Sequence, residues 1–217
     1  MLAAMDEMAN ASGRGVYVLA AHADWNASRV NRRLFAAAAA TPGVVLRDLY
    51  ASYPDYDIDV AREQAAAAAA RLIVLLHPVQ WYSMPPLLKL WLDEVLTHGW
   101  AYGHGGIALQ GKDLWLVAST GGGQASYHPQ GYNRYSFDAF LPPYEQTAAL
   151  CGMRFLPPLV LHGAHRAPED ELQRHVQVFA ERLGTHPDWP ELQELAACVA
   201  CEVPQADRPA EAGAAVR

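Results

Sequence analysis

The sequence predicts an α/β protein built as a doubly wound, five-stranded parallel sheet with helices on both faces. Short apolar runs alternate along the chain with longer segments that read as helices. The third run, residues 72–77, carries no polar residue before its final histidine, as expected of a parallel strand covered on both faces. The chain has 217 residues and is 52 % hydrophobic, which is enough for one domain with a full core.

The expected elements follow one another in alternation. Strands are expected at residues 15–21, 44–48, 72–77, 114–119 and 159–162. Helices are expected at residues 29–40, 60–71, 85–96, 137–151 and 169–183. Ser28 can cap the first helix, which a Thr-Pro-Gly sequence ends. The third helix opens with a Pro-Pro pair, which fits a first turn whose amides have no helical partner, and a second such pair interrupts the fourth.

We expect residues 15–184 to form the domain, with extensions at residues 1–14 and 185–217. A polar, aromatic loop is expected at residues 50–59. From about residue 204 the composition becomes Pro, Ala, Asp, Glu and Arg without pattern, which indicates disorder.

Composition excludes several classes of protein. No stretch has the ~18 or more consecutive apolar residues of a transmembrane helix, and the first residues do not read as a signal peptide. Three cysteines make no disulfide framework and suit a reducing cytosol, so we expect a cytoplasmic protein. The net charge of −7 disfavours nucleic acid and anionic lipid, so any bound anion needs a local site.

Three loops are expected at the carboxyl edge of the sheet, where doubly wound proteins bind ligands. The first, at residues 22–28, feeds the amino end of a helix and carries His22, Ser28, Arg29 and Asn31, which suits an anion. The alternative for this loop is plain helix capping by Ser28. No G-x-G-x-x-G sequence is present, so a dinucleotide fingerprint is absent.

Of the other two loops, one carries flat aromatic side chains and the other is rich in glycine. Trp81 and Tyr82, in residues 78–84, can pack beside a heteroaromatic ring, although they could instead plug the gap between strand and helix. The sequence Ser-Thr-Gly-Gly-Gly at residues 119–123 lets backbone approach a ligand closely. Tyr127 and His128 follow it as candidate proton donors. It is not a P-loop, because the Lys-Ser/Thr ending is missing.

Two further motifs are weaker. The Gly-His-Gly-Gly sequence at residues 103–106 follows a helix rather than a strand, so we expect a lid or an interface loop. Cys198 and Cys201 have the spacing of a redox or zinc pair, but no second ligand pair accompanies them, so we expect no metal. No G-x-S-x-G elbow follows any strand, which disfavours a serine hydrolase.

The helix at residues 85–96 is apolar around much of its circumference, whereas a helix on the outside of a sheet needs one apolar stripe. The excess predicts a second partner, most simply another copy of the chain. We therefore expect a homodimer whose interface lies beside the ligand loops.

From residue 15 to about 165 the chain resembles the flavodoxin-like NAD(P)H:quinone oxidoreductases. Among them it is most similar to the ancillary flavoproteins of glutathione-regulated potassium-efflux systems. The similarity lies in YPDYDID at residues 53–59, HPVQWYSMPPLLKLWLDEVLTHGWAYGHGG at residues 77–106 and STGGG at residues 119–123. The long central segment is hard to match by chance.

The resemblance implies FMN as cofactor, with NADPH or NADH as hydride donor. The positions that match the family's cofactor site are His22, Ser28, Arg29, Val30, Asn31, Val79, Gln80, Trp81, Tyr82, Ser119, Thr120, Gly121 and Gly122. Tyr127 has the spacing of the active-site tyrosine of animal quinone reductases, whose histidine six residues later is here Asn133. His128 is the expected substitute. Asp24 places a carboxylate near the phosphate site and must point away from it.

The resemblance implies hydride transfer in two steps, in which NAD(P)H and a quinone use the same place in turn. Amides of Gly121 and Gly122 would stabilise charge developing on the ring. One alternative is a regulatory subunit of a membrane potassium antiporter, bound to the inner membrane through that partner. Another is a one-electron flavodoxin carrier, against which the predicted dimer and lid argue.

Overall fold

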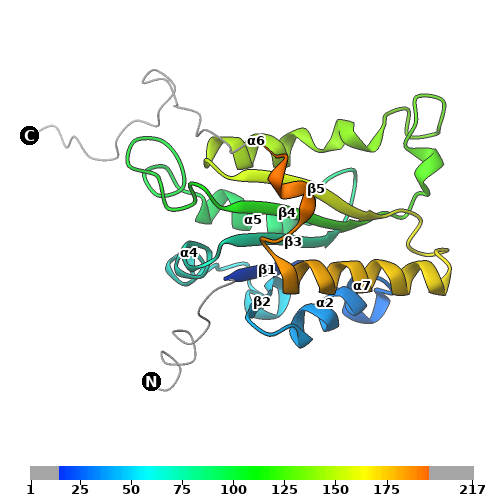
Figure 1. Ribbon diagram of the computed structural model, residues 1–217, viewed down its shortest axis with the longest axis horizontal. Coiled ribbons are helices and arrows are strands. Elements are labelled where there is room, and N and C mark those ends of the chain that lie inside the picture. Colours follow the sequence, from blue (N-terminus) through cyan, green and yellow to red (C-terminus); the bar gives the residue numbers. More distant parts are fainter. Residues whose placement is uncertain (1–14, 196–217) are drawn as a thin grey trace, which may run out of the picture.

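The computed structural model describes residues 15–195, which form a five-stranded parallel sheet in the order β2-β1-β3-β4-β5 (Figure 1). The strands are β1 Val16–Ala20, β2 Val44–Asp48, β3 Leu72–Pro78, β4 Asp113–Ser119 and β5 Arg154–Leu161. The long helices are α2 Asn31–Ala40, α4 Val60–Ala69, α5 Pro86–Val95, α6 Pro142–Leu150 and α7 Glu169–Thr185. The predicted doubly wound sheet is confirmed. Strand order reverses between β1 and β3, which fixes the edge where a ligand is expected.

The two faces of the sheet are covered by different helices, as Figure 1 shows. Leu34 of α2 and Phe179 of α7 pack with Val18 and Trp115 on one face. On the other face lie α4, α5 and α6, with Trp91 at the centre of their core. Strands β1, β3 and β4 are buried almost along their whole length, which is why their sequences are continuous apolar runs.

Some strands and helices begin or end at residues other than those predicted, because prolines and capping residues set their boundaries. Strand β5 begins at Arg154 rather than at residue 159, and its Pro-Pro pair accompanies a register irregularity against β4 between Trp115 and Val117. The first residues of the loop expected at 50–59 instead belong to a short helix, α3 Leu49–Ser52, which Asp48 caps by accepting from the Ala51 amide. The segment expected as one interrupted helix divides into a 3-10 turn, η3 Phe137–Phe140, and α6.

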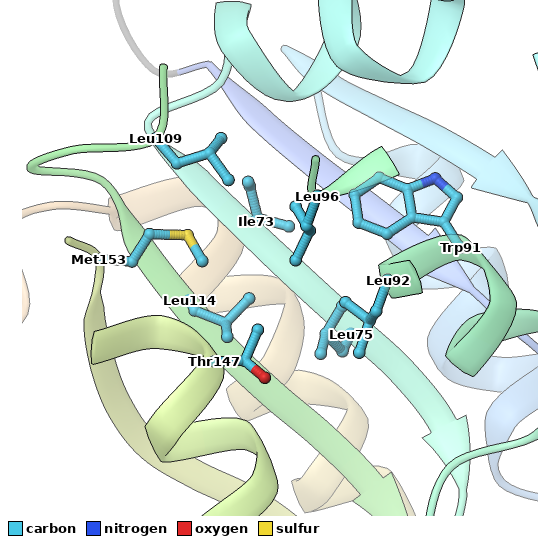
Figure 2. Close-up of a pocket in the computed structure, with 9 residues that line it drawn as sticks. All are labelled: Ile73, Leu75, Trp91, Leu92, Leu96, Leu109, Leu114, Thr147 and Met153. Carbon is cyan, nitrogen blue, oxygen red and sulfur yellow. The ribbon is translucent and has the colours of Figure 1, made fainter. Parts of the chain in front are cut away.

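A small apolar cavity of about 10 Å³ lies between α5, α6 and the sheet. Figure 2 shows Trp91 and Leu92 of α5 and Leu96, which follows that helix, beside it, with residues of β3 and β4 beneath. Its polar lining residue, Thr147, already donates to the Pro143 carbonyl at 2.7 Å. A gap of this size and polarity is a packing void between side chains and has no donor or acceptor to offer a ligand.

The first part of the C-terminal extension packs on the domain. Trp189 is buried against Trp115, with ring centroids 4.9 Å apart, and the imidazole of His186 lies 2.8 Å from Asp113. Arg154 holds the same carboxylate through two nitrogens. Burial disfavours the charged Asp113, but hydrogen bonds from His186 and Arg154 prevail and lower its pKa. Residues 1–14 and 196–217, with Cys198 and Cys201, lie outside the described residues.

Candidate active site

The three loops predicted from the sequence meet at the carboxyl edge of the sheet, beyond the ends of β1, β3 and β4. Two hydrogen bonds tie them together. The side-chain amide of Asn31 donates to Ser119 Oγ at 2.9 Å, and the Val79 amide donates to the Ser119 carbonyl at 2.7 Å. Residues separated by up to 88 positions in sequence are thereby fixed around one point.

In the first loop the carboxylate of Asp24 is held by the backbone of its own turn. Asp24 accepts from the Asn26 amide at 2.9 Å and caps the short turn η1 Trp25–Ala27. His22 accepts from the Asp24 amide through Nδ1 and its ring lies against Trp25. Burial lowers the pKa of His22, although Asp24 opposes this, so the imidazole is neutral at pH 7. His22 therefore offers the site a neutral ring and no fixed positive charge.

The amino end of α2 is built to leave polar groups open. Helix α2 begins at Asn31, two residues later than predicted, and Ser28 accepts from the Arg32 amide at 3.3 Å, so the expected capping role of Ser28 is present. Val30 occupies the cap position without a side-chain cap bond. The first amides of a helix have no intrahelical acceptor, and together they favour an anion.

Two side chains at this helix end are placed very differently. Arg29 donates to the Ala167 carbonyl at 2.6 Å and pairs with Glu169, so its charge ties the segment before α2 to the start of α7. Asn31 is buried, and its Oδ1 has no hydrogen-bond partner within residues 15–195. Whichever way the amide is turned, one end of it is unsatisfied, which is uncommon for a buried polar group and fits a missing ligand.

The second loop presents its aromatic residues outward. Gln80 and Ser83 exchange backbone hydrogen bonds of 2.9 and 3.0 Å, which closes a tight turn. Within it Trp81 and Tyr82 adopt positive φ angles of 47° and 66°, a conformation that costs bulky residues ~1–3 kcal/mol and is typical of functional sites. Trp81 is 94 % exposed. The alternative of an aromatic plug in the interior is therefore wrong.

The third loop contains the buried hydroxyl of Thr120. This hydroxyl donates to the Gly122 carbonyl at 2.7 Å and lies 3.0 Å from Nδ1 of His162. A Cβ atom at Gly122 would stand 2.7 Å from the Tyr132 hydroxyl and 2.8 Å from Ser126 Oγ. Glycine at this position thus leaves room for the side-chain hydroxyls of Ser126 and Tyr132, which follow it in the chain.

The candidate proton donors are not equally placed. Tyr127 is half-buried between Phe137 and His162, whose ring centroids lie 5.4 and 5.2 Å from its own. Burial raises the pKa of Tyr127. His128 is exposed, and its Nδ1 accepts from the Gln130 amide at 3.3 Å. Asn133 accepts from the Tyr82 hydroxyl at 3.3 Å.

Sequence reasoning missed His162. Its spacing from the other histidines suits no metal, so the sequence alone does not single it out. It directly follows β5, which ends at Leu161, and so lies at the same edge as the three loops. The rule that selected those loops would also have selected His162, had the boundaries of β5 been assigned correctly.

The residues at this edge fit a phosphorylated, flat heteroaromatic ligand such as FMN. The first amides of α2 and the hydroxyl of Ser28 suit the phosphate of such a ligand. The unsatisfied amide of Asn31 suits a polar group on the chain that joins phosphate and ring. The backbone of residues 120–122 suits the polar edge of the ring. Within residues 15–195 no group of three or more His, Cys, Asp or Glu side chains could hold a metal ion. No helix in that part of the chain could span a bilayer.

Comparison with known proteins shows the family to which this chain belongs. The model of the flavodoxin-like fold family matches residues 15–183. The chain belongs to this family. Among curated relatives, the glutathione-regulated potassium-efflux system ancillary protein KefF of Citrobacter koseri is 45 % identical over 168 residues, covering 77 % of this chain and 94 % of the relative. KefF of Klebsiella aerogenes is 43 % identical over 179 residues, covering 82 % and 98 %.

Solved structures agree. General stress protein 14 of Treponema denticola, in complex with FMN, aligns with a TM-score of 0.73 and 36 % identity, covering 77 % of this chain and 97 % of that one. An NADPH-quinone reductase from P. pentosaceus aligns with a TM-score of 0.70 and 28 % identity, covering 79 % and 98 %.

Proposed function

We propose that this protein is an FMN-dependent NAD(P)H:quinone oxidoreductase. The observation that carries the proposal is the convergence of three features at one edge of the sheet: an open helix amino end, an exposed aromatic turn and a Thr-Gly-Gly loop with a buried hydroxyl. The relatives' names support it, since one solved structure contains FMN and another is called an NADPH-quinone reductase.

In this proposal the first loop and the α2 end hold the FMN phosphate through the amides near Val30 and the hydroxyl of Ser28. The turn at Val79, Gln80, Trp81 and Tyr82 and the Ser119–Gly122 loop hold the ring. When bound, FMN accepts a hydride from NAD(P)H and passes it to the quinone. The protein supplies orientation and a polar environment around that reaction.

The residues of this chain would act on the ring edge and on the quinone oxygen. Amides of Gly121 and Gly122 would lie at the edge of the ring where negative charge develops and would stabilise that charge. Tyr127 is protonated at pH 7, because burial raises its pKa, and so can donate a hydrogen bond to the quinone oxygen. The ring of Tyr82, stacked on Phe140 at 5.3 Å, gives a flat substrate one aromatic wall.

The visible absorption spectrum of the purified protein tests this proposal. We expect a yellow protein, or one that becomes yellow with added FMN, that is bleached by NADPH and recovers with a benzoquinone. Initial rates should show ping-pong kinetics. A colourless protein that takes up no FMN would overturn the proposal.

A second role is favoured by the names of the curated relatives, which are ancillary proteins of glutathione-regulated potassium efflux. We infer that this protein also binds a potassium antiporter and works in the cytoplasm at the inner membrane. Co-purification with the antiporter of the same cell tests this. An antiporter whose activity is unchanged when the protein is deleted would contradict it.

We further infer a homodimer. Leu90 and Leu92 of α5, and Leu96 directly after it, pack against the core but are only partly buried, so part of the apolar excess seen in the sequence remains available to a second copy. Sedimentation of a dimer at micromolar concentration is the expected result. A monomer under those conditions would contradict it.

A further inference from the structure

The indole of Trp25 connects the first loop to the end of β2. Its Nε1 donates to Oδ2 of Asp48 at 2.8 Å, and Oδ1 of the same carboxylate accepts from the Ala51 amide at 3.2 Å. Trp25 opens the turn η1, whereas Asp48 is the last residue of β2 and the cap of α3. The first loop is thereby fastened to an element that lies 23 positions further along the chain.

The same indole supports the ring of His22. The centroids of these two rings lie 5.3 Å apart, and the indole also contacts Phe35 of α2, at 4.7 Å. Trp25 and Phe35 are partly buried and pack against the core on the α2 face of the sheet. Because ring contact with α2 and a hydrogen bond to β2 both hold the indole, it has little freedom to turn. The imidazole of His22 therefore lies against a fixed surface.

The backbone decides which nitrogen of His22 carries the proton. Nδ1 accepts from the Asp24 amide at 3.1 Å, so in the neutral ring the proton is on Nε2. Burial lowers the pKa of His22, so the neutral form prevails at pH 7. Within residues 15–195 the Nε2 atom has no hydrogen-bond partner. His22 thus presents an N–H donor at the edge of the sheet where the ligand is expected.

The carboxylates near this imidazole are occupied by donors of the chain itself. Asp24 and Asp48 are the charged groups that act on His22, and both favour its protonated form, although burial outweighs them. Each of these carboxylates accepts from a backbone amide, and that of Asp48 also accepts from the indole. The aromatic ring in contact with His22 belongs to Trp25, which does not titrate. An anion beside His22 therefore meets carboxylates that already have hydrogen-bond donors.

We propose that Trp25, tethered by Asp48, is a positioning residue that orients His22 to donate its Nε2–H to the phosphate of FMN. The proposal rests on the proposed function, in which that phosphate lies at the first loop and the amino end of α2. A hydrogen bond to an ionised acceptor is roughly twice as strong as one between neutral groups, so a neutral imidazole suffices. Trp25 acts through His22 alone, and no covalent bond forms or breaks.

The state of the imidazole can be measured without cofactor. In protein labelled with ¹⁵N-histidine and stripped of FMN, we expect His22 to show the Nε2–H form at pH 7 and a pKa below 6.5, with His22→Ala identifying its signals. Trp25→Leu should raise this pKa towards 6.5, because the imidazole loses the ring that helps to bury it. An Nδ1–H form in the parent protein, or a pKa that Trp25→Leu leaves unchanged, would overturn the proposal.

Affinities for FMN and riboflavin separate the phosphate contact from the ring contacts, because the two ligands differ only in the phosphate. Trp25→Phe keeps an aromatic ring beside His22 but loses the N–H that Asp48 accepts. We expect it to bind FMN about fivefold more weakly, the range of one hydrogen bond, and to bind riboflavin as the parent does. Quenching of flavin fluorescence measures both affinities. Equal losses for the two ligands, or the parent's affinity for FMN, would overturn the proposal.

A matched control removes a different indole N–H. Nε1 of Trp189 donates to the Arg182 carbonyl at 3.0 Å, and Trp189→Phe deletes that hydrogen bond while keeping a ring in place. This variant should bind FMN as the parent does. If Trp189→Phe weakens FMN binding as much as Trp25→Phe, the effect is one of general stability and the positioning role is wrong.

A double-mutant cycle shows whether Trp25 acts through His22. We expect His22→Ala to weaken FMN binding by about 10-fold, because the donor to the phosphate is lost. If Trp25 only orients that donor, Trp25→Phe should weaken binding no further in the His22→Ala protein. Two losses that multiply would show that Trp25 contributes independently of His22, which would overturn the proposal.

This proposal and the proposed function can fail separately. A parent protein that binds no FMN would overturn both, even if the Nε2–H form of His22 were found. A parent protein that binds FMN and oxidises NADPH, but whose affinity for FMN is unaffected by Trp25→Phe, would overturn the positioning role alone.

Discussion

Two buried polar groups, Glu63 and Asn31, show how differently the same fold treats a structural group and a ligand group. Glu63 is fully buried, and its carboxylate accepts from Tyr53 at 2.6 Å, from Trp91 at 2.8 Å and from Tyr17, while Arg47 lies 2.9 Å away. Each of the two carboxylate oxygens of Glu63 therefore has two donors. Asn31, at the carboxyl edge, keeps one amide end without any partner in the described chain.

The difference indicates what each group is for. A buried charge without partners is costly, so the four donors around Glu63 join β1, β2, α4 and α5 into one unit whatever else is bound. A buried amide that lacks a partner is stable only if a ligand or water completes it. Saturation distinguishes Glu63 from Asn31, although His98, His175 and His186 also keep an unpartnered ring nitrogen away from this edge. Four predictions test which groups belong to the scaffold and which to the site, from the largest effect to the smallest.

Removing Glu63 should have the largest effect. Glu63→Ala leaves the Arg47 charge and three donors buried without their acceptor, and breaking such an arrangement costs about 3–5 kcal/mol of unfolding free energy. The denaturant midpoint measures this. Asp93→Ala, which removes an exposed carboxylate paired with Lys89, is the control and should change stability by less than about 0.5 kcal/mol. Equal losses in the two variants would show that Glu63 is no scaffold.

His175 provides the second test, because it is a buried group with an unsatisfied atom that lies far from the site in sequence, on α7. Burial lowers its pKa from 6.5 to about 4. Between pH 4 and 6.5 the unfolded chain therefore binds more protons than the folded protein does. His175 has no effect on stability above pH 6.5, and it lowers the free energy of unfolding as the pH falls below that value.

From this shift we expect His175→Leu to be about 2 kcal/mol more stable than the parent at pH 5 and similar to it at pH 7.5. Denaturant titrations at both pH values measure the effect. His77, whose pKa burial also lowers to about 4, remains in both proteins, so some acid sensitivity should persist. A variant without any gain at pH 5 would contradict the sign of the argument.

Asn31 is the third test, and we expect its removal to weaken ligand binding rather than stability. Asn31→Ala removes the unsatisfied amide together with one hydrogen bond to Ser119, so stability should change little. FMN should bind about 10-fold more weakly, the equivalent of ~1.4 kcal/mol, because a hydrogen bond to the ligand is lost. Titration of the variant by quenching of FMN fluorescence gives the affinity. Loss of stability without loss of affinity would place Asn31 in the scaffold.

The sequence predicted the scaffold better than the site. Alternating apolar runs predicted the five strands and that they are parallel, because burial on both faces leaves little choice of residue. It also selected the three loops, since each follows a buried strand. It could not show that Arg29 turns to Glu169, or that His162 rather than His128 meets Tyr127. Those contacts join residues far apart in the chain, and periodicity carries no information about them.

Trp81 gives the smallest expected change in stability and the sharpest contrast between scaffold and site. The side chain is 94 % exposed and its backbone has a φ of 47°, so Trp81→Ala removes almost no packing. We expect the unfolding free energy to change by no more than about 0.5 kcal/mol, the usual range for exposed positions. If the indole packs beside the ring of FMN, affinity should still fall about fivefold, since aromatic contacts contribute ~0.5–1.5 kcal/mol. Trp189→Ala, in which the lost indole is buried against Trp115, is the matched control and should lose stability but not FMN affinity. A Trp81→Ala protein that loses stability and keeps its affinity would reverse the assignment, because the exposed turn would then belong to the scaffold.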